Sequence, residues 1–413
     1  MMENTKKPAI RFKGYTEAWE QRKLGELAEF SKGQGYTKSD LRESGIPIIL
    51  YGRLYTKYQP IIREVDTFAD ATPQAVFSKG GEVILPSSGE TAEDIAIAAS
   101  VDKSGFLLGG GLNIVLPHKE IDSAFLAIEI SFGTPHTELA KRAQGKSVVH
   151  LYNEDLKAVE ISYPTIAEQK QISTLFDSFD NLITLHQRKC DRLQNVKKSM
   201  LEKMFPKSGS KFPEIRFKGF TEAWEQRKLG KVGTTYTGLA GKTKEDFGHG
   251  NGQFVTYMNV FSNSVASPEM TEPVEIDERQ NKVLAGDVLF TTSSETPEEV
   301  GMSSVWLENS DNTYLNSFCF GYRPSIPFDP YYLAYMLRSS SMRKKIAFLA
   351  QGISRYNISK NKMMDIEIPV PTMNEQMQVG GYFRNLDNLI TLHQRKLEKL
   401  RNIKKSMLEK MFV

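Results

Sequence analysis

The chain has 413 residues, of which 25% are charged and 40% hydrophobic, so collagen-like and wholly disordered proteins are excluded. Its 53 basic and 50 acidic residues leave a net charge of only +3, which excludes a protein that coats nucleic acid by bulk charge. Any nucleic-acid binding must come from local groups of side chains. The sequence contains two cysteines, no secretory leader and no long apolar run, which favours a cytoplasmic protein without a membrane span.

Two sequence segments occur twice. Residues 11–25 read RFKGYTEAWEQRKLG and residues 216–230 read RFKGFTEAWEQRKLG, a single difference. Residues 180–205 and 387–412 are identical at 21 of 26 positions. The offsets of 205 and 207 residues are far longer than the period of a solenoid. The chain is therefore predicted to be a tandem duplication of a globular domain followed by a long helix.

The stretches between these segments have diverged, although a few motifs recur. Ala143-Gln144-Gly145 corresponds to Ala350-Gln351-Gly352. Short β-type runs precede helical patterns in both halves, so each middle is predicted to be α+β. The expected strands are 46–51, 82–85, 113–116, 254–257 and 287–290, and the expected helices are 124–130 and 331–348. Identical frames around different middles indicate one shared partner and two different ligands.

The two long helices are predicted to pack together. Apolar residues recur in each at alternating spacings of three and four, the pattern of a coiled-coil seam. The expected seam includes Leu182, His186 and Lys189 in the first copy and Leu389, His393 and Lys396 in the second. The two histidines are interpreted as polar seam positions rather than a metal pair or a pH switch, because no ligand spacing accompanies them.

The sequence lacks a complete catalytic motif. Gly238–Thr243 ends like a phosphate-binding loop, but Tyr236 occupies the position of the first glycine. Asp329-Pro330-Tyr331-Tyr332 lacks the second proline of an adenine methyltransferase loop and any upstream glycine-rich motif. We therefore expect a binding chain with no catalytic residue, metal or cofactor of its own.

One segment is unusually basic. Residues 338–362 carry seven Lys or Arg side chains and no acid, with polar and aromatic residues interleaved. Such a mixture suits contacts to phosphates and base edges, and a charged helix followed by a loop is the alternative. The basic residues of 188–203 and 395–410 are interpreted as a solvated helix face, with phosphate binding or docking to an acidic partner as the alternative.

Together these motifs resemble the specificity (S) subunit of type I restriction-modification systems. The shared pattern is Pro-x-Ile-Arg-Phe-Lys-Gly-[YF]-Thr at each start, then Ala-Gln-Gly, Pro-Thr-x-x-x-Glu-Gln, and a helix ending Lys-Lys-Ser-Met-Leu-x-Lys-Met-Phe. The resemblance implies two α+β target-recognition domains separated by two long antiparallel helices that form a coiled-coil rod. The expected boundaries are 1–170 and 213–377 for the domains, 171–206 and 378–413 for the helices, and 207–212 for the linker.

The resemblance also implies partners. Two methyltransferase subunits would supply S-adenosylmethionine and modify adenine, and two restriction subunits would use ATP and Mg for translocation and cleavage. This chain would choose a bipartite, asymmetric site on double-stranded DNA, with half-site centres about 34–36 Å apart if the two domains read one helical turn apart. A protein-binding scaffold with two variable modules is the alternative function.

Polar loop positions in each middle are the predicted DNA contacts. In the first half they are Tyr51, Arg53, Ser87, Ser88, Lys146, His150 and Tyr152. In the second half they are Lys242, Lys244, Tyr257, Asn259, Ser293, Ser294, Arg355, Tyr356 and Asn357. Trp19 and Trp224 are assigned to the framework and to methyltransferase docking, with core packing as the alternative.

Overall fold

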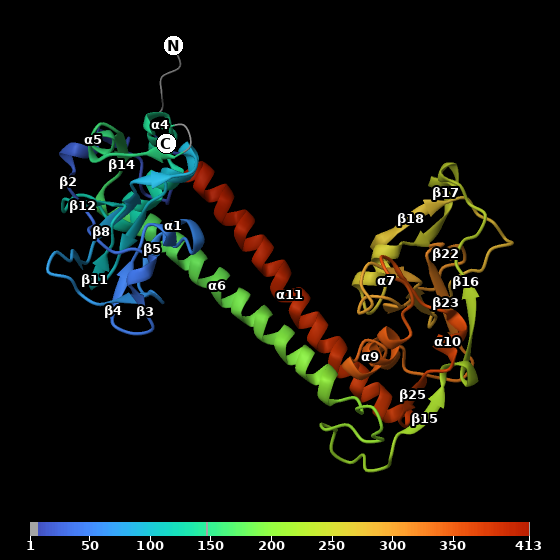
Figure 1. The fold of residues 1–413 in the computed structure, drawn as a ribbon. Coiled ribbons are helices and arrows are strands. Elements are labelled where there is room, and N and C mark those ends of the chain that lie inside the picture. Colours follow the sequence, from blue (N-terminus) through green and yellow to red (C-terminus); the bar gives the residue numbers. More distant parts are fainter. Residues whose placement is uncertain (1–6, 146–147, 413) are drawn as a thin grey trace. The chain divides into compact units, whose positions relative to one another are not determined.

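The computed structural model describes residues 7–145 and 148–412, and the chain divides into two compact units. Unit 1 consists of residues 1–187 and 395–413, and unit 2 consists of residues 188–394. Figure 1 shows the two long helices, α6 (Ile166–Lys203) and α11 (Met373–Met411), which begin before the predicted positions 171 and 378. Each unit therefore contains the first part of one long helix and the last part of the other. Within the described ranges, no helix is long and apolar enough to cross a membrane.

Unit 1 contains two five-stranded sheets and two ribbons. The central sheet has the order β2 (Ala28–Lys32), β12 (Leu112–Pro117), β8 (Glu82–Pro86), β10 (Ala99–Val101), β5 (Ile61–Ile62). The second sheet has the order β3 (Leu41–Arg42), β6 (Phe68–Ala69), β4 (Ile46–Ile49), β11 (Ser104–Leu108), β7 (Phe77–Lys79). The ribbons are β1 (Glu20–Lys23) with β14 (Glu160–Tyr163) and β9 (Ser88–Gly89) with β13 (Val149–His150). The short helices are α1 (Gly52–Thr56), α2 (Ala92–Ile95), α3 (Ser123–Phe132), α4 (Thr134–Arg142) and α5 (Asn153–Lys157).

Unit 2 repeats this plan with fewer strands. Its central sheet has the order β16 (Gly233–Thr237), β23 (Cys319–Pro324), β19 (Val288–Thr291), β21 (Ser303–Val305). Its second sheet has the order β18 (Thr271–Val274), β17 (Phe247–Val255), β22 (Thr313–Leu315). Its ribbons are β15 (Glu225–Lys228) with β25 (Glu367–Val370) and β20 (Ser293–Ser294) with β24 (Tyr356–Asn357). The short helices are α7 (Tyr257–Ser262), α8 (Pro330–Met336), α9 (Ser340–Phe348) and α10 (Lys360–Met364).

The inner strands β8 and β19 of the central sheets are buried on both faces, and this explains the continuous apolar runs that predicted them. Successive side chains of a strand point to opposite faces. In β8, Val83 joins the core shared with the helices, whereas Ile84 joins the core shared with the second sheet. In β19, Val288 and Leu289 divide in the same way. Both units are thus α+β domains, as predicted, and the structure shows three layers in each.

The predicted helix 331–348 is two helices, α8 and α9, so this prediction was wrong in one respect. Ser339 has extended backbone angles (φ −63°, ψ 151°) and precedes α9 as its N-cap residue. Asp329 is the N-cap residue that sets the start of α8, because its carboxylate accepts a hydrogen bond from the Tyr332 amide at 2.8 Å. An apolar pattern alone does not show this start. Asp122 caps α3 in the same way through the Phe125 amide at 2.9 Å.

The repeated starts and ends of the two halves meet inside the cores. In unit 1, Trp19 lies edge-on to Phe125 and to Phe412 from the end of α11, with ring centroids 5.8 and 6.3 Å apart. In unit 2, Trp224 lies edge-on to Phe205, which follows the end of α6, at 6.4 Å. Both tryptophans are buried. The assignment of these tryptophans to methyltransferase docking is therefore wrong, and core packing is correct.

The long helices run antiparallel where they pair within each unit. In unit 1, Lys404 of α11 binds Asp180 of α6, and Arg401 donates to Gln187. In unit 2, Lys197 of α6 binds Asp387 of α11, and Cys190 lies against Ile390. These pairs confirm that the two helices pack together.

At every second position of the predicted seam, the more buried residue is the one that follows the predicted residue. Leu182 and Leu389 are exposed, as are Lys189 and Lys396, whereas Cys190, Ile390 and Leu397 are buried. The apolar stripe is wide enough to fit either phase, because Leu182-Ile183 and Leu389-Ile390 are adjacent apolar pairs. The sequence pattern therefore predicted the pairing of the helices but not which residues lie between them.

This correction predicts unequal effects for two leucines of α11. Leu397 is 5% exposed and Leu389 is 44% exposed. We expect Leu397→Ala to lower the free energy of unfolding by about 2–4 kcal/mol, because it removes buried methyl groups and leaves a cavity. Leu389→Ala should change it by less than about 0.5 kcal/mol in the isolated chain. Urea unfolding of both variants is the measurement, and equal losses would favour the original seam.

Candidate nucleic-acid interface

Two equivalent ribbons bring predicted DNA-contact residues together from distant parts of the sequence. In unit 1, Ser88 of β9 pairs with His150 of β13. In unit 2, Ser293 of β20 pairs with Asn357 of β24, and Ser294 pairs with Tyr356. The structure thus groups six of the predicted residues into two sites with the same backbone plan.

The Ala-Gln-Gly motif forms a tight loop beside each ribbon. The backbones of Gln351 and Asn357 exchange two hydrogen bonds of 2.8 and 2.9 Å, and Gln144 and His150 do the same in unit 1 at 2.8 and 3.1 Å. Gly352 has φ +143°, and a Cβ atom there would lie 2.0 Å from the Arg355 carbonyl oxygen. Only glycine therefore fits this position. The predicted contact Lys146 lies in the unit 1 loop, outside the described residues.

The loop of unit 2 presents side chains to solvent. Arg355 and Asn357 are exposed, and Tyr356 is half-buried against the core. Ile353, which is 95% exposed, also belongs to this loop. A cation and an amide at adjoining positions are the groups that read guanine and adenine edges or bind phosphate.

Unit 1 combines aromatic rings with a cation near its ribbon. The His150 ring stacks on the Tyr152 ring at a centroid distance of 6.2 Å and an interplanar angle of 18°. Lys32 Nζ lies 5.5 Å from the centroid of the Tyr152 ring. Ser87 donates its amide to the Gly111 carbonyl oxygen and accepts from the Leu151 amide, so its backbone is fixed. His150 and Tyr152 are exposed and can contact a ligand.

Tyr51 and Tyr257 occupy equivalent places after β4 and β17. The Tyr257 hydroxyl donates a 2.6 Å hydrogen bond to the Ser293 carbonyl oxygen. Tyr51 is exposed and lies edge-on to Tyr55, whose hydroxyl donates to the Ser88 carbonyl oxygen at 2.9 Å. A tyrosine therefore anchors each ribbon to the helix that follows the second-sheet strand. Our sequence reasoning missed Tyr55 and Lys32, although Tyr55 lies one helical turn from Tyr51.

Four predicted contacts have side chains that the fold itself uses or buries. Arg53 donates to Asp66, Gln59 and the Glu64 carbonyl oxygen. Asn259 is fully buried and donates to the Ser267 and Met270 carbonyl oxygens. Ser293 and Ser294 are also buried and contribute backbone rather than side chain to the surface. We therefore withdraw these four side chains as direct DNA contacts.

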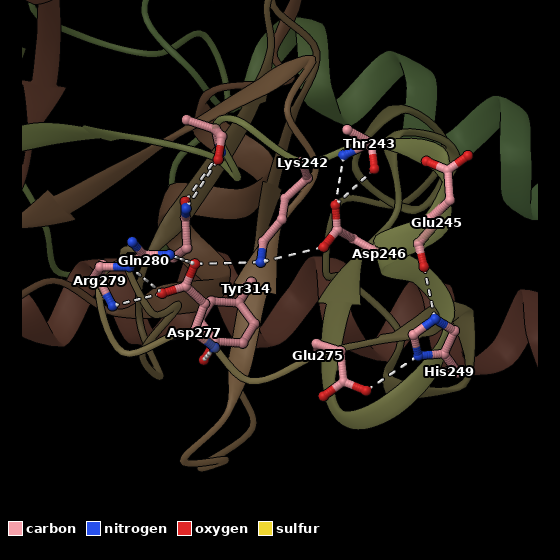
Figure 2. A network of polar contacts seen from close by, with 11 residues as sticks. Lys242, Thr243, Glu245, Asp246, His249, Glu275, Asp277, Arg279, Gln280 and Tyr314 are labelled. Atoms are coloured by element: carbon pink, nitrogen blue, oxygen red, sulfur yellow. Dashed lines mark hydrogen bonds and ion pairs between the residues drawn. The ribbon is translucent and has the colours of Figure 1, made fainter.

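Lys242 belongs to the polar network of Figure 2 and is held away from free solvent. Its Nζ lies 3.3 Å from Asp277 Oδ2 and 4.0 Å from Asp246 Oδ1. Arg279 Nε donates to Asp277 Oδ1 at 3.0 Å, and the hydrogen bonds from Arg279 lower the pKa of the Asp277 carboxyl. This network fixes the segment before β17 to the segment after β18. Lys244, which takes no part in the drawn contacts, is exposed and stays available.

His249 lies at the other end of the polar network in Figure 2. One ring nitrogen lies 2.7 Å from the Glu245 carbonyl oxygen, and the other lies 3.2 Å from a Glu275 carboxylate oxygen. These two acceptors raise the pKa of His249, the carbonyl contact contributing most. The side chain is well exposed, so we assign it no role in stability.

The basic segment 338–362 is divided between the fold and the surface. Arg338 donates to the carbonyl oxygens of Ser303, Val260, Phe261 and Asn263, at 2.6 to 2.9 Å. Arg343 donates to the carbonyl oxygens of Gly301, Glu298 and Val300. Burial lowers the pKa of each arginine to about 10. The interpretation of these two arginines as phosphate contacts is therefore wrong, and Arg355 is the exposed guanidinium of this segment.

Some lysines of the same segment line a cavity. Lys344, Lys345 and Lys362, with Lys207 and Lys228, surround a cavity of about 820 Å³ in unit 2. Lys228 is paired with Asp365 at 3.2 Å, and Lys345 donates to the Glu367 carbonyl oxygen at 2.8 Å. Among the residues that the structure describes, no group of three or more His, Cys, Asp or Glu side chains could hold a metal ion.

Comparison with known families identifies the duplicated domain. The family model of the type I restriction modification DNA specificity domain matches residues 16–195 and again residues 221–402. The chain belongs to the type I restriction-modification specificity family. As a specificity subunit it is the non-catalytic, DNA-recognising component of a restriction-modification complex with partner subunits.

Relatives of this specificity subunit match along nearly its whole length. The type I restriction enzyme MjaVIII specificity subunit of Methanocaldococcus jannaschii is 22% identical over 412 residues, covering 95% of this chain and 91% of its own. The crystal structure of an S subunit from M. genitalium has a TM-score of 0.57 at 14% identity, covering 98% and 99% of the two chains. A chain from a structural study of type I complex assembly has a TM-score of 0.52 at 17% identity, covering 95% and 97%. These structures support the fold of the specificity subunit.

Proposed function

We propose that the two units of this specificity subunit read two different half-sites of a bipartite, asymmetric target on double-stranded DNA. The observation that carries this proposal is the pair of equivalent ribbons with different side chains. Unit 1 presents His150, Tyr152 and Lys32, whereas unit 2 presents Arg355 and Asn357. The same backbone plan with different hydrogen-bonding groups is expected for two modules that read different base sequences.

We further propose that two methyltransferase subunits bind the repeated frame and modify adenine. Equivalent leucines are exposed on the two long helices, Leu182 and Leu185 on α6 and Leu389 and Leu392 on α11. An exposed apolar patch marks a protein interaction site, and two equal patches suit two copies of one partner. S-adenosylmethionine would then belong to these partners, and ATP and Mg to two restriction subunits. This assembly would work in the cytoplasm.

Methylation mapping tests the proposal. The chain would be co-expressed with its adenine methyltransferase partner in cells without other adenine methylation, and modified sites would be read by sequencing. We expect one bipartite motif with two unlike halves and an unspecified spacer. A single contiguous motif would contradict the two-reader model. A lack of DNA retention, with or without the partner, would favour the protein-binding scaffold.

Arg355→Ala tests the placement of the second reader. If Arg355 contacts a base, the substitution should weaken binding by about 1–3 kcal/mol and relax selectivity at one position. If it contacts a phosphate, binding to all sequences should weaken and the salt slope should fall by about 1. Fluorescence anisotropy of the complex at several salt concentrations distinguishes these cases. Arg192→Ala, which removes an exposed arginine of α6, is the control, and unchanged binding by Arg355→Ala would show that the reader is wrongly placed.

A further inference from the structure

Three large apolar side chains are exposed around the recognition ribbon of unit 2. Met258 is 54% exposed, Phe318 57% and Ile353 95%. Each lies in a segment outside the regular strands, at the start of α7, before β23 and in the Ala-Gln-Gly loop respectively. Such exposure of apolar surface indicates a binding function rather than a contribution to folding.

Hydrogen bonds tie all three segments to residues 292–293. The Phe318 carbonyl oxygen accepts from the Thr292 amide at 2.9 Å and from the Thr292 hydroxyl at 2.8 Å. Met258 follows Tyr257, whose hydroxyl donates to the Ser293 carbonyl oxygen. The loop that carries Ile353 closes at Asn357, which pairs with Ser293. The three segments that carry these side chains therefore meet at the start of one short strand.

Unit 1 has different residues at the equivalent places. The register of β4 with β11 matches that of β17 with β22, so Gly52 is equivalent to Met258. The pairing of β8 with β12 matches that of β19 with β23, so Gly111 is equivalent to Phe318. By the same offset the sequence places Lys146 opposite Ile353. Apolar side chains at these three places are thus found in unit 2, whereas the loop of unit 1 exposes one smaller apolar residue, Val148, at the place of Arg355.

The neighbouring charge favours nucleic acid as the ligand. Arg355 is exposed two residues from Ile353, which provides a cation for a phosphate or a guanine edge next to the apolar group. In the major groove, the apolar group that a protein can read is the C5-methyl of thymine. An apolar side chain next to a hydrogen-bonding cation therefore matches a thymine next to a polar base edge.

We propose that unit 2 reads its half-site partly by apolar contacts of Met258, Phe318 and Ile353 with thymine methyl groups in the major groove. This inference rests on the proposed function, since it requires that unit 2 contacts DNA through its ribbon. The sequence of unit 1 has two glycines and a lysine at the equivalent positions, so these three contacts belong to unit 2. The half-site of unit 2 must then contain at least one T·A pair at a specified position.

Deoxyuridine substitution provides the test, because it removes the thymine methyl and leaves every hydrogen-bonding group in place. Duplexes with the mapped target would carry deoxyuridine at single thymine positions of each half-site, and binding to the methyltransferase-bound complex would be measured. We expect about a fourfold loss for each contacted thymine of the unit 2 half-site, the factor for one buried methyl group. Any loss from deoxyuridine in the unit 1 half-site, where Val148 is exposed, should be unaffected by substitution of the three unit 2 residues.

Variants assign the effect to the three side chains. Ile353→Ala, Met258→Gly and Phe318→Gly, the last two carrying the unit 1 residues, should each make binding indifferent to deoxyuridine at one position. A unit 2 half-site without thymine would overturn the inference, as would full binding to every duplex with deoxyuridine in the unit 2 half-site. Unstacking of the target bases, detected with a fluorescent base analogue, would also overturn it by showing insertion between bases. A complex that shows no sequence selectivity would instead refute the proposed function itself.

Discussion

Replacing Glu168 with glutamine should destabilise unit 1 by about 3–5 kcal/mol, because it leaves a half-buried guanidinium without its counter-charge. The Glu168 side chain is 0% exposed, and that of Arg11 is 13% exposed. Arg11 Nε donates to Oε1 at 2.7 Å and Nη2 donates to Oε2 at 2.8 Å, and these hydrogen bonds raise the pKa of Arg11. Glutamine keeps the shape of the side chain, so the loss reports the charge and one hydrogen bond.

The duplication provides a second copy of this experiment. Arg216 and Glu375 form the same bidentate pair in unit 2 at 2.7 and 2.9 Å. Glu375→Gln should therefore destabilise unit 2 by a similar amount. Hydrogen exchange measured by mass spectrometry separates the two units, since a two-unit chain need not unfold in one step. Glu154→Gln, which removes an exposed ion pair with Lys157, is the control and should change stability by less than about 1 kcal/mol. Losses as small as this control in both buried pairs would show that the pairs do not hold the frame.

Glu129→Met should stabilise unit 1 by about 2–4 kcal/mol, because it removes a carboxyl group from an apolar core. Glu129 lies on α3, is fully buried, and neither of its carboxylate oxygens has a hydrogen-bond partner in the described part of the chain. The equivalent residue of unit 2 is Met336, seven residues after the capping aspartate in both helices. Methionine at this position is therefore already compatible with the fold.

The stabilising effect of Glu129→Met should grow with pH. Burial raises the pKa of Glu129 well above its usual 4.5, so the folded chain keeps a proton that the unfolded chain releases. The wild-type chain therefore loses stability as the pH rises from about 4.5 towards the raised pKa, and methionine removes this loss. Glu129→Gln isolates the cause, since it abolishes the titration but keeps a buried polar group. Urea unfolding between pH 4.5 and 8 is the measurement, and parallel curves for the three chains would refute the assignment.

The sequence predicted those parts of the fold that are repeated or periodic. The identical segments around Trp19 and Trp224 showed the duplication, and wide apolar stripes showed the long helices. The phase of the helix seam could not be predicted, because Leu389 and Ile390 are both apolar and only the three-dimensional contact decides between them. The break before α9 was also missed, since it depends on one extended residue, Ser339, within an otherwise helical pattern.

Some of the predicted contact residues lie together in the structure, whereas the fold itself uses the side chains of others. Ser88 with His150, and Ser293 with Asn357, were selected as polar loop residues and meet in the two ribbons. Arg53 and Asn259 looked equally exposed in the sequence, yet backbone carbonyl groups of neighbouring turns use them. A long polar side chain near a turn can hydrogen-bond to the backbone of its own chain or extend into solvent, and the amino-acid sequence does not distinguish these two cases. Only the position of the acceptors in the folded chain separates Arg338 from Arg355.

The exchange of helix ends between the halves also sets the order in which the protein can fold during synthesis. The core of unit 1 contains Trp19 from its beginning and Met411 and Phe412 from the last turn of α11 and just after it. The hydrophobic core of unit 1 therefore remains incomplete until the ribosome has synthesised almost the entire second repeat. Domains in most multidomain chains fold in the order of their synthesis. Here the N-terminal unit is completed last, so an incomplete translation product cannot carry a finished unit 1.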